Sequence, residues 1–221
     1  MPRNVKAPLA GWLVCVGGLI LLALLVFGVG PAQRLDASIL VRFIAEPGSA
    51  GDLLAARLAR LGDPPAQLLM LALACGIGLM RGRPRSAVAA LVVVAGANLT
   101  TQALKVALAH PRFQSLLGAE QLSWNSFPSG HTTAAAAIAL AFAFVVPRGL
   151  RPLVAVLGTC LVVAMGCSVL VLAWHYPTDV VGGVLVAGAW GFATLAALRL
   201  VEGAPSRRPV QLGRRAAISL K

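Results

Sequence analysis

The chain has 221 residues, of which 58% are hydrophobic and only 12% are charged. Soluble domains carry about 25% charged residues, so this composition excludes an ordinary soluble protein and indicates a membrane protein. A net charge of +12 is also found in nucleic-acid-binding proteins. Here, however, the cations lie in short loops and tails between apolar runs and do not follow one polar face. We therefore expect no nucleic-acid partner.

The first apolar run extends from Leu9 to Val29 and follows Arg3 and Lys6. It is longer than the core of a signal peptide, which has roughly 7–15 residues, and it is long enough to span a bilayer. The segment Pro31-Ala32-Gln33 is a poor cleavage site. We expect this run to be retained as the first transmembrane helix.

Five further apolar runs follow, and each is expected to be helical because a helix satisfies its own backbone hydrogen bonds in lipid. The predicted spans are Leu9–Val29, Pro65–Met80, Ser86–Ala109, His131–Val146, Leu153–Trp174 and Val180–Leu198. The second and fourth are short against the about 20 residues that a span usually needs. The sequence thus predicts an all-α, polytopic membrane protein with about six transmembrane helices in one bundle. Residues 1–202 form this single domain, and residues 203–221 are predicted to be a disordered basic tail.

The loop of residues 33–64 contains two short helical patterns, around Leu35–Ile44 and Asp52–Leu61. The second pattern has leucines on one face and arginines on another. It fits either a helix that lies in the membrane interface or a loop helix packed on the bundle.

Cations distinguish the two sides of the membrane. Those of the N-terminus, of two short loops and of the C-terminal tail lie on one side, and they include Arg3, Lys6, Arg81, Arg83, Arg85, Arg148, Arg151 and Arg199. The loops 33–64 and 110–128 balance their cations with acids. The positive-inside rule then predicts that both termini are cytoplasmic. It puts three polar motifs together on the opposite, outer face.

The first motif is Lys105, followed by Arg112. A lysine near the end of an apolar helix could simply extend to the interface. Pro111 is expected to end the helix, so that Arg112 can fold back toward Lys105. A flexible point charge and a planar guanidinium together suit a phosphate group.

The second motif is Pro128-Ser129-Gly130-His131, which opens the fourth span. Ser126 or Ser129 can cap this helix, whose N-terminus presents free amides to an anion. Gly130 lets an anion approach the backbone, and the Ser129 hydroxyl can donate to it. The unperturbed pKa of histidine lies near neutrality, so His131 can act as a general acid. A capped helix with an incidental histidine is the alternative.

The third motif is His175-Tyr176-Pro177-Thr178-Asp179. Pro177 argues against a continuous helix, so we expect a turn to bring His175 and Asp179 together. A carboxylate on one imidazole nitrogen would fix the tautomer, which makes His175 a candidate nucleophile. A purely structural pair is the alternative.

Two other chemistries would use the same residues. Two histidines and an aspartate could bind zinc, but Lys105 and Arg112 would repel a cation, and we expect no metal or other cofactor. A nucleophilic Ser129 lacks the Gly-x-Ser-x-Gly context, and a site rich in cations favours phosphate over carbonyl chemistry.

Together the three motifs resemble the signature of the type 2 phosphatidic-acid phosphatases, which are integral-membrane lipid phosphatases with six helices. The second motif of that signature is matched in full by residues 128–131. In the first, lysine and arginine match and Phe113 replaces a proline. In the third, Ser168, His175 and Asp179 match, and Val169 replaces an arginine.

The resemblance implies a lipid phosphatase that needs no metal and forms a phosphohistidine. It implies that His175 is the nucleophile, Asp179 its partner and His131 the general acid. It implies that the phosphate oxygens are held by Lys105, Arg112, Ser129, Gly130 and Ser168.

Val169 leaves three interpretations open, because loss of one preorganised donor typically lowers a rate by roughly 10²–10³. The chain is a phosphatase with a rearranged site, a phosphotransferase that passes the phosphoryl group to another lipid, or a phospholipid-binding or transport protein without catalysis. The two histidines and the aspartate favour catalysis. Bacterial members with an outward-facing site act on undecaprenyl pyrophosphate, phosphatidylglycerol phosphate or lipid A phosphates. The resemblance therefore implies a bacterial inner membrane and a site that faces the periplasm.

Overall fold

The computed structural model describes residues 5–109 and 124–203. All regular structure in these residues is helical. The α-helices are α1 (Lys6–Gly28), α2 (Gly30–Leu40), α3 (Ala50–Ala59), α4 (Pro64–Met80), α5 (Pro84–Ala107), α6 (Gly130–Val145), α7 (Arg151–Val171) and α8 (Pro177–Gly203). Two short 3-10 helices, η1 (Arg60–Gly62) and η2 (Arg148–Leu150), precede α4 and α7.

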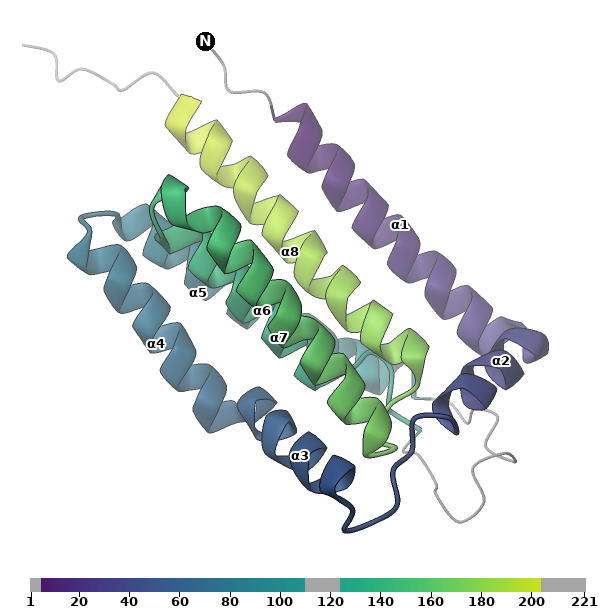
Figure 1. The fold of residues 1–221 in the computed structure, drawn as a ribbon. Coiled ribbons are helices and arrows are strands. Elements are labelled where there is room, and N and C mark those ends of the chain that lie inside the picture. The colour runs from purple at the N-terminus through teal and green to yellow at the C-terminus, as the bar shows by residue number, and fades with distance from the viewer. Residues whose placement is uncertain (1–4, 110–123, 204–221) are drawn as a thin grey trace, which may run out of the picture.

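The long helices run side by side in one bundle (Figure 1). Helix α6 is central and packs against α4, α5, α7 and α8, whereas α1 lies outside α8. The core of α6 is made of small side chains, and Ala134, Ala137 and Ala141 are fully buried. Glycines allow equally close approaches elsewhere, since a Cβ on Gly96 would lie 2.5 Å from the Trp190 ring. Small residues at helix contacts are typical of membrane proteins, in which backbones approach closely without a hydrophobic driving force.

The predicted all-α, polytopic class is confirmed, and a helix lies at each of the six predicted spans. Within the described residues, four helices are long and apolar enough to cross a membrane alone: α1, α5, α7 with η2, and α8. The two predicted spans that are shorter than a bilayer requires, now α4 and α6, do not reach that length on their own. Helix α6 has 16 residues, and α4 reaches the required length only together with α3 and η1.

Helices α3 and α4 meet at a bend of 51°. Asp63 lies between them, immediately before Pro64 and Pro65. The two predicted loop helices are present as α2 and α3. Helix α3 packs on α7 and buries Ala55 and Ala59, while Leu53 and Leu54 remain exposed.

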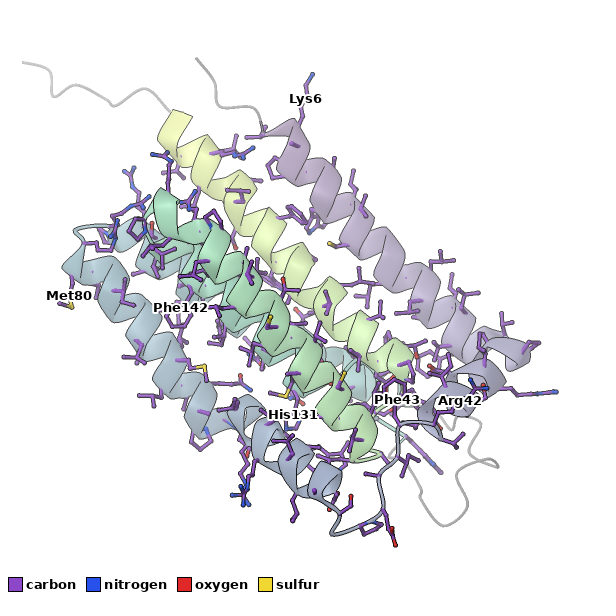
Figure 2. All side chains as sticks on the ribbon, in the orientation of Figure 1. Lys6, Arg42, Phe43, Met80, His131 and Phe142 are labelled. Carbon is purple, nitrogen blue, oxygen red and sulfur yellow. The ribbon has the colours of Figure 1, made fainter. Side chains whose placement is uncertain are left out.

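The two ends of the bundle differ in what they contain. Lys6 and the α4–α5 turn lie at one end, and His131, α2 and α3 lie at the other (Figure 2). The cationic loops and the polar motifs are therefore at opposite ends of the molecule. The tail beyond residue 203 and the segment with Arg112 lie outside the described residues, so the predicted domain limits stay a prediction.

Candidate active site

His175 and Asp179 come together at the turn that begins α8. Pro177 is the first residue of the helix, so its missing N–H leaves no donor unsatisfied. Asp179 Oδ2 accepts a hydrogen bond of 2.9 Å from the backbone N–H of Tyr176. The same oxygen lies 3.4 Å from His175 Nδ1, and both side chains are buried. The predicted turn therefore exists, and Asp179 closes it in the manner of a capping box.

The end of α7 holds His175 from the other side. The carbonyl oxygen of Val169 accepts the N–H groups of Trp174 at 2.9 Å and His175 at 3.3 Å. Ala173 adopts a positive φ of 53°, which reverses the chain at this point. A left-handed conformation is unfavourable for alanine and persists only where its surroundings impose it. The backbone hydrogen bonds of residues 169–175 thus fix the position of the His175 backbone, from which the imidazole extends.

Ser168 and Val169, the first two positions of the third motif, are both buried. The Ser168 hydroxyl donates to the carbonyl oxygen of Ala164 at 2.7 Å, within its own helix. The side chain of Val169 has no exposed surface. A phosphate-binding role for Ser168 stays a prediction.

A buried acid that the sequence did not single out supports the same turn. Asp36 of α2 is 3% exposed. Its carboxylate accepts from the backbone N–H of Thr178 at 3.1 Å and from the hydroxyl of the same residue. Asp36 therefore caps the N-terminus of α8 from a distant element. No local sequence signal marks this contact.

The N-terminus of α6 is tied directly to that of α8. Ser129 caps α6, and its Oγ accepts from the backbone N–H of Thr132 at 3.3 Å. The backbone N–H of Ser129 donates to the carbonyl oxygen of Asp179 at 2.9 Å. Gly183 makes this approach possible, because a Cβ there would lie 2.7 Å from the Ser129 carbonyl oxygen. Of the two capping serines that the sequence allows, Ser129 is the one used.

Lys105 reaches this junction from α5. A Cβ built on Gly130 would lie 3.9 Å from Lys105 Cε. The ammonium group is also close enough to Asp179 for their charges to attract. One cation therefore faces the helix N-terminus where an anion would bind.

His131 lies on the first turn of α6, half-buried against η1. Its Nε2 is 3.5 Å from Asp63 Oδ1, and its ring centroid is 5.3 Å from that of Trp174. The imidazole is near enough to His175 and Lys105 for their charges to act on it. Asp63 and Trp174 are further neighbours that the motif spacing did not reveal.

The structure thus brings together His131, His175, Asp179, Lys105, Ser129 and Gly130, while Arg112 lies outside the described residues. In residues 5–109 and 124–203, no three acidic, cysteine or histidine residues are grouped as they are around a metal ion.

The comparisons with known proteins agree with this arrangement. The family model of the PAP2 superfamily matches residues 86–201, more than half of the chain. The chain belongs to the PAP2 superfamily. The predicted resemblance is thereby confirmed. A comparison with curated proteins finds no match.

Among solved structures, this PAP2 chain is similar to a crystal structure described as the first transmembrane PAP2 type phosphatidylglycerolphosphate phosphatase from Bacillus subtilis. The TM-score is 0.69 at 19% sequence identity, and the likeness covers 91% of this chain and 98% of the other. At this identity the likeness concerns the fold. Because it covers 91% of this chain, it extends beyond the residues matched by the PAP2 family model.

Proposed function

We propose that this PAP2 protein is a membrane lipid phosphatase. It would hydrolyse a phosphate monoester or pyrophosphate of a lipid through a phosphohistidine, without a metal ion. The observation that carries the proposal is the pairing of His175 with Asp179 at the point where α8 touches the N-terminus of α6. A nucleophile, an anion-binding helix end and the cation of Lys105 converge there.

In the proposed first step, Nε2 of His175 attacks phosphorus. Asp179, whose Oδ2 lies 3.4 Å from Nδ1, would hold the Nδ1 proton and stabilise the imidazolium that forms. The bond between phosphorus and the lipid oxygen breaks, and this oxygen takes a proton from His131. Water then attacks the phosphohistidine, gives a proton to His131, and releases inorganic phosphate and free His175.

The phosphate oxygens would be bound by donors at the end of α6 and by cations around it. Because Ser129 Oγ accepts from the Thr132 amide, its own hydroxyl proton can go to the phosphate. The Gly130 N–H is among the amides of the first turn that lack a partner inside the helix. Lys105, Arg112 and Ser168 complete the proposed set of ligands.

An apolar groove next to this site supports a lipid substrate. It has a volume of about 530 Å³ and is lined by Leu19, Ile20, Ala23, Leu24, Phe27, Gly28, Leu104, Leu108 and Phe127. Leu104 lies on α5 next to Lys105, Leu108 is the C-cap residue of the same helix, and Phe127 directly precedes the second motif. The hydrocarbon chain of a lipid in this groove would have its phosphate beside Lys105.

We further propose that the protein lies in a bacterial inner membrane with this end of the bundle facing the periplasm. The opposite end carries the excess of cations. Single cysteines replacing Glu46 and Arg83, in a chain whose native cysteines are removed, test this orientation. An impermeant thiol reagent added to intact cells should label position 46 and leave position 83 unlabelled. The reverse pattern overturns the orientation.

Phosphate release by the purified protein tests the activity. Undecaprenyl pyrophosphate, phosphatidylglycerol phosphate and lipid A are offered in detergent with EDTA present, beside a His175→Ala variant. We expect release from at least one lipid by the native chain and none by the variant. Transfer of the phosphoryl group to a second lipid would instead indicate a phosphotransferase. If the protein neither releases nor transfers phosphate, the remaining interpretation is a lipid-binding protein.

A further inference from the structure

Asp63 stands at the N-cap position of α4, yet its side chain caps nothing there. Aspartate is among the preferred N-cap residues because its carboxylate accepts the free amides of the first turn. Here the next two residues are Pro64 and Pro65, which have no N–H to offer. The carboxylate turns toward His131 instead and ends 3.5 Å from Nε2.

The 3-10 helix η1 holds one edge of the same imidazole. A Cβ on Gly62 would lie 2.6 Å from His131 Cδ2, so the Gly62 backbone is in contact with the ring. Gln67 fixes this backbone, because its side-chain amide donates to the Gly62 carbonyl oxygen. Gly62 and Asp63 thus cover the edge formed by Cδ2 and Nε2. Nδ1 lies on the opposite edge, away from η1.

We propose that Asp63 is the positioning residue of the general acid. Its carboxylate holds Nε2–H of His131, so that Nδ1 is the atom that exchanges a proton with the substrate. Asp63 would therefore do for His131 what Asp179 does for His175. This inference rests on the proposed function, since it assigns a role within the same reaction.

The proton balance follows from this assignment. When the bond between phosphorus and the lipid oxygen breaks, the proton on Nδ1 moves to that oxygen and His131 becomes neutral. When water attacks the phosphohistidine, Nδ1 takes the proton of the water and the imidazolium is restored. Nε2–H stays with Asp63 throughout, and Asp63 touches neither the lipid nor the phosphate.

A change of leaving atom separates this role from a merely structural one. The substrate is a lipid phosphate that the native chain hydrolyses, compared with the same lipid carrying sulfur in place of the bridging oxygen. A thiol has a pKa of about 8.5, far below that of an alcohol, and leaves without a proton donor. The quantity compared is kcat/KM, which includes the step that releases the lipid.

For Asp63→Asn we expect kcat/KM on the oxygen ester to fall roughly tenfold to hundredfold, as part of the 10²–10⁴ that a general acid supplies. On the sulfur analogue it should change by less than about threefold. His131→Ala should show the same selectivity to a larger degree, and adding Asp63→Asn to it should have no further effect. Asp63→Glu should recover part of the loss. Glu46→Gln, an exposed acid of the loop before α3, is the matched control.

Equal losses on both substrates, or additive effects with His131→Ala, would overturn the assignment of Asp63. No loss on the oxygen ester would overturn it as well. If the native chain hydrolyses neither substrate and no other lipid phosphate, the proposed function itself has failed.

Discussion

The two histidine–aspartate pairs of the site are built in different ways. His175 and Asp179 lie within one turn of chain, and both side chains are buried. In the same turn, the Asp179 carboxylate accepts a hydrogen bond from the backbone N–H of Tyr176. His131 and Asp63 come from distant elements, and the Asp63 side chain is 51% exposed. The first pair is part of the core of the fold, whereas the second is a surface contact between α6 and the bend before α4. Changes to the first should therefore affect folding and activity together, and changes to the second mainly activity.

The strongest test of this comparison is Asp179→Asn. An amide cannot both accept from the Tyr176 N–H and stabilise the His175 imidazolium as a carboxylate does. We expect kcat to fall by roughly 10³–10⁴ and the melting temperature to fall with it, because a buried partner is lost. Lipid phosphate hydrolysis and thermal unfolding in detergent measure the two effects.

Asp52→Asn is the control for this variant. Asp52 also lies in the first turn of a helix and accepts an upstream amide, that of Gly48, and the partners given for its hydrogen bonds, Gly48 and Ser49, are not site residues. It should leave activity unchanged. A melting temperature for Asp179→Asn equal to that of the native chain would show that the buried pair is not part of the core.

The second test breaks the contact that aligns the two pairs. A Cβ on Gly183 would meet the backbone of Ser129 at 2.7 Å and that of Thr133 at 3.0 Å. Gly183→Ala must therefore move α8 away from α6, with a loss of about 1–3 kcal/mol of stability. Activity should drop at least about tenfold, because near-angstrom displacements of reacting groups have large effects.

Gly17→Ala is the matched substitution in α1, where a Cβ would have nothing within 4 Å. It should behave as the native chain does in both assays. If Gly183→Ala also behaves so, the Ser129–Asp179 contact does not align the site.

The smallest effect is expected at the exposed pair. In Gly62→Ala the new methyl group would lie 2.6 Å from Cδ2 and 3.1 Å from Cβ of His131. The half-buried ring can turn aside, but Gly62 is itself buried and the Cβ does not move when the ring rotates. We expect activity to fall severalfold and stability to fall by about 1 kcal/mol, the low end of the range for overpacking. Gly149→Ala in η2, where a Cβ again meets nothing within 4 Å, is the control. A large loss of stability in Gly62→Ala alone would remove the distinction between the two pairs.

The same distinction, between contacts within one stretch of chain and contacts between distant elements, decides which features of the fold and site the sequence predicts. Long apolar runs give the helices because their length and composition are local properties, and α1 and α8 lie within a few residues of the predicted limits. Asp179 is readable because it lies four residues from His175. The contacts of Asp63 and Asp36 were not predicted, because each carboxylate contacts a residue far along the chain and no local sequence spacing indicates the pairing. The break between α3 and α4 falls between the predicted loop helix and the predicted second span, but the angle of 51° between them was not predicted.

Asp36 also bears on how the protein is made. Its carboxylate belongs to α2, and its partner Thr178, 142 residues away along the chain, lies in the first turn of α8. The backbone N–H and the hydroxyl of Thr178 can reach this carboxylate only after α8 has been synthesised. His175 gains its final support only then, so a partly inserted chain carries all the early helices and still lacks a finished site.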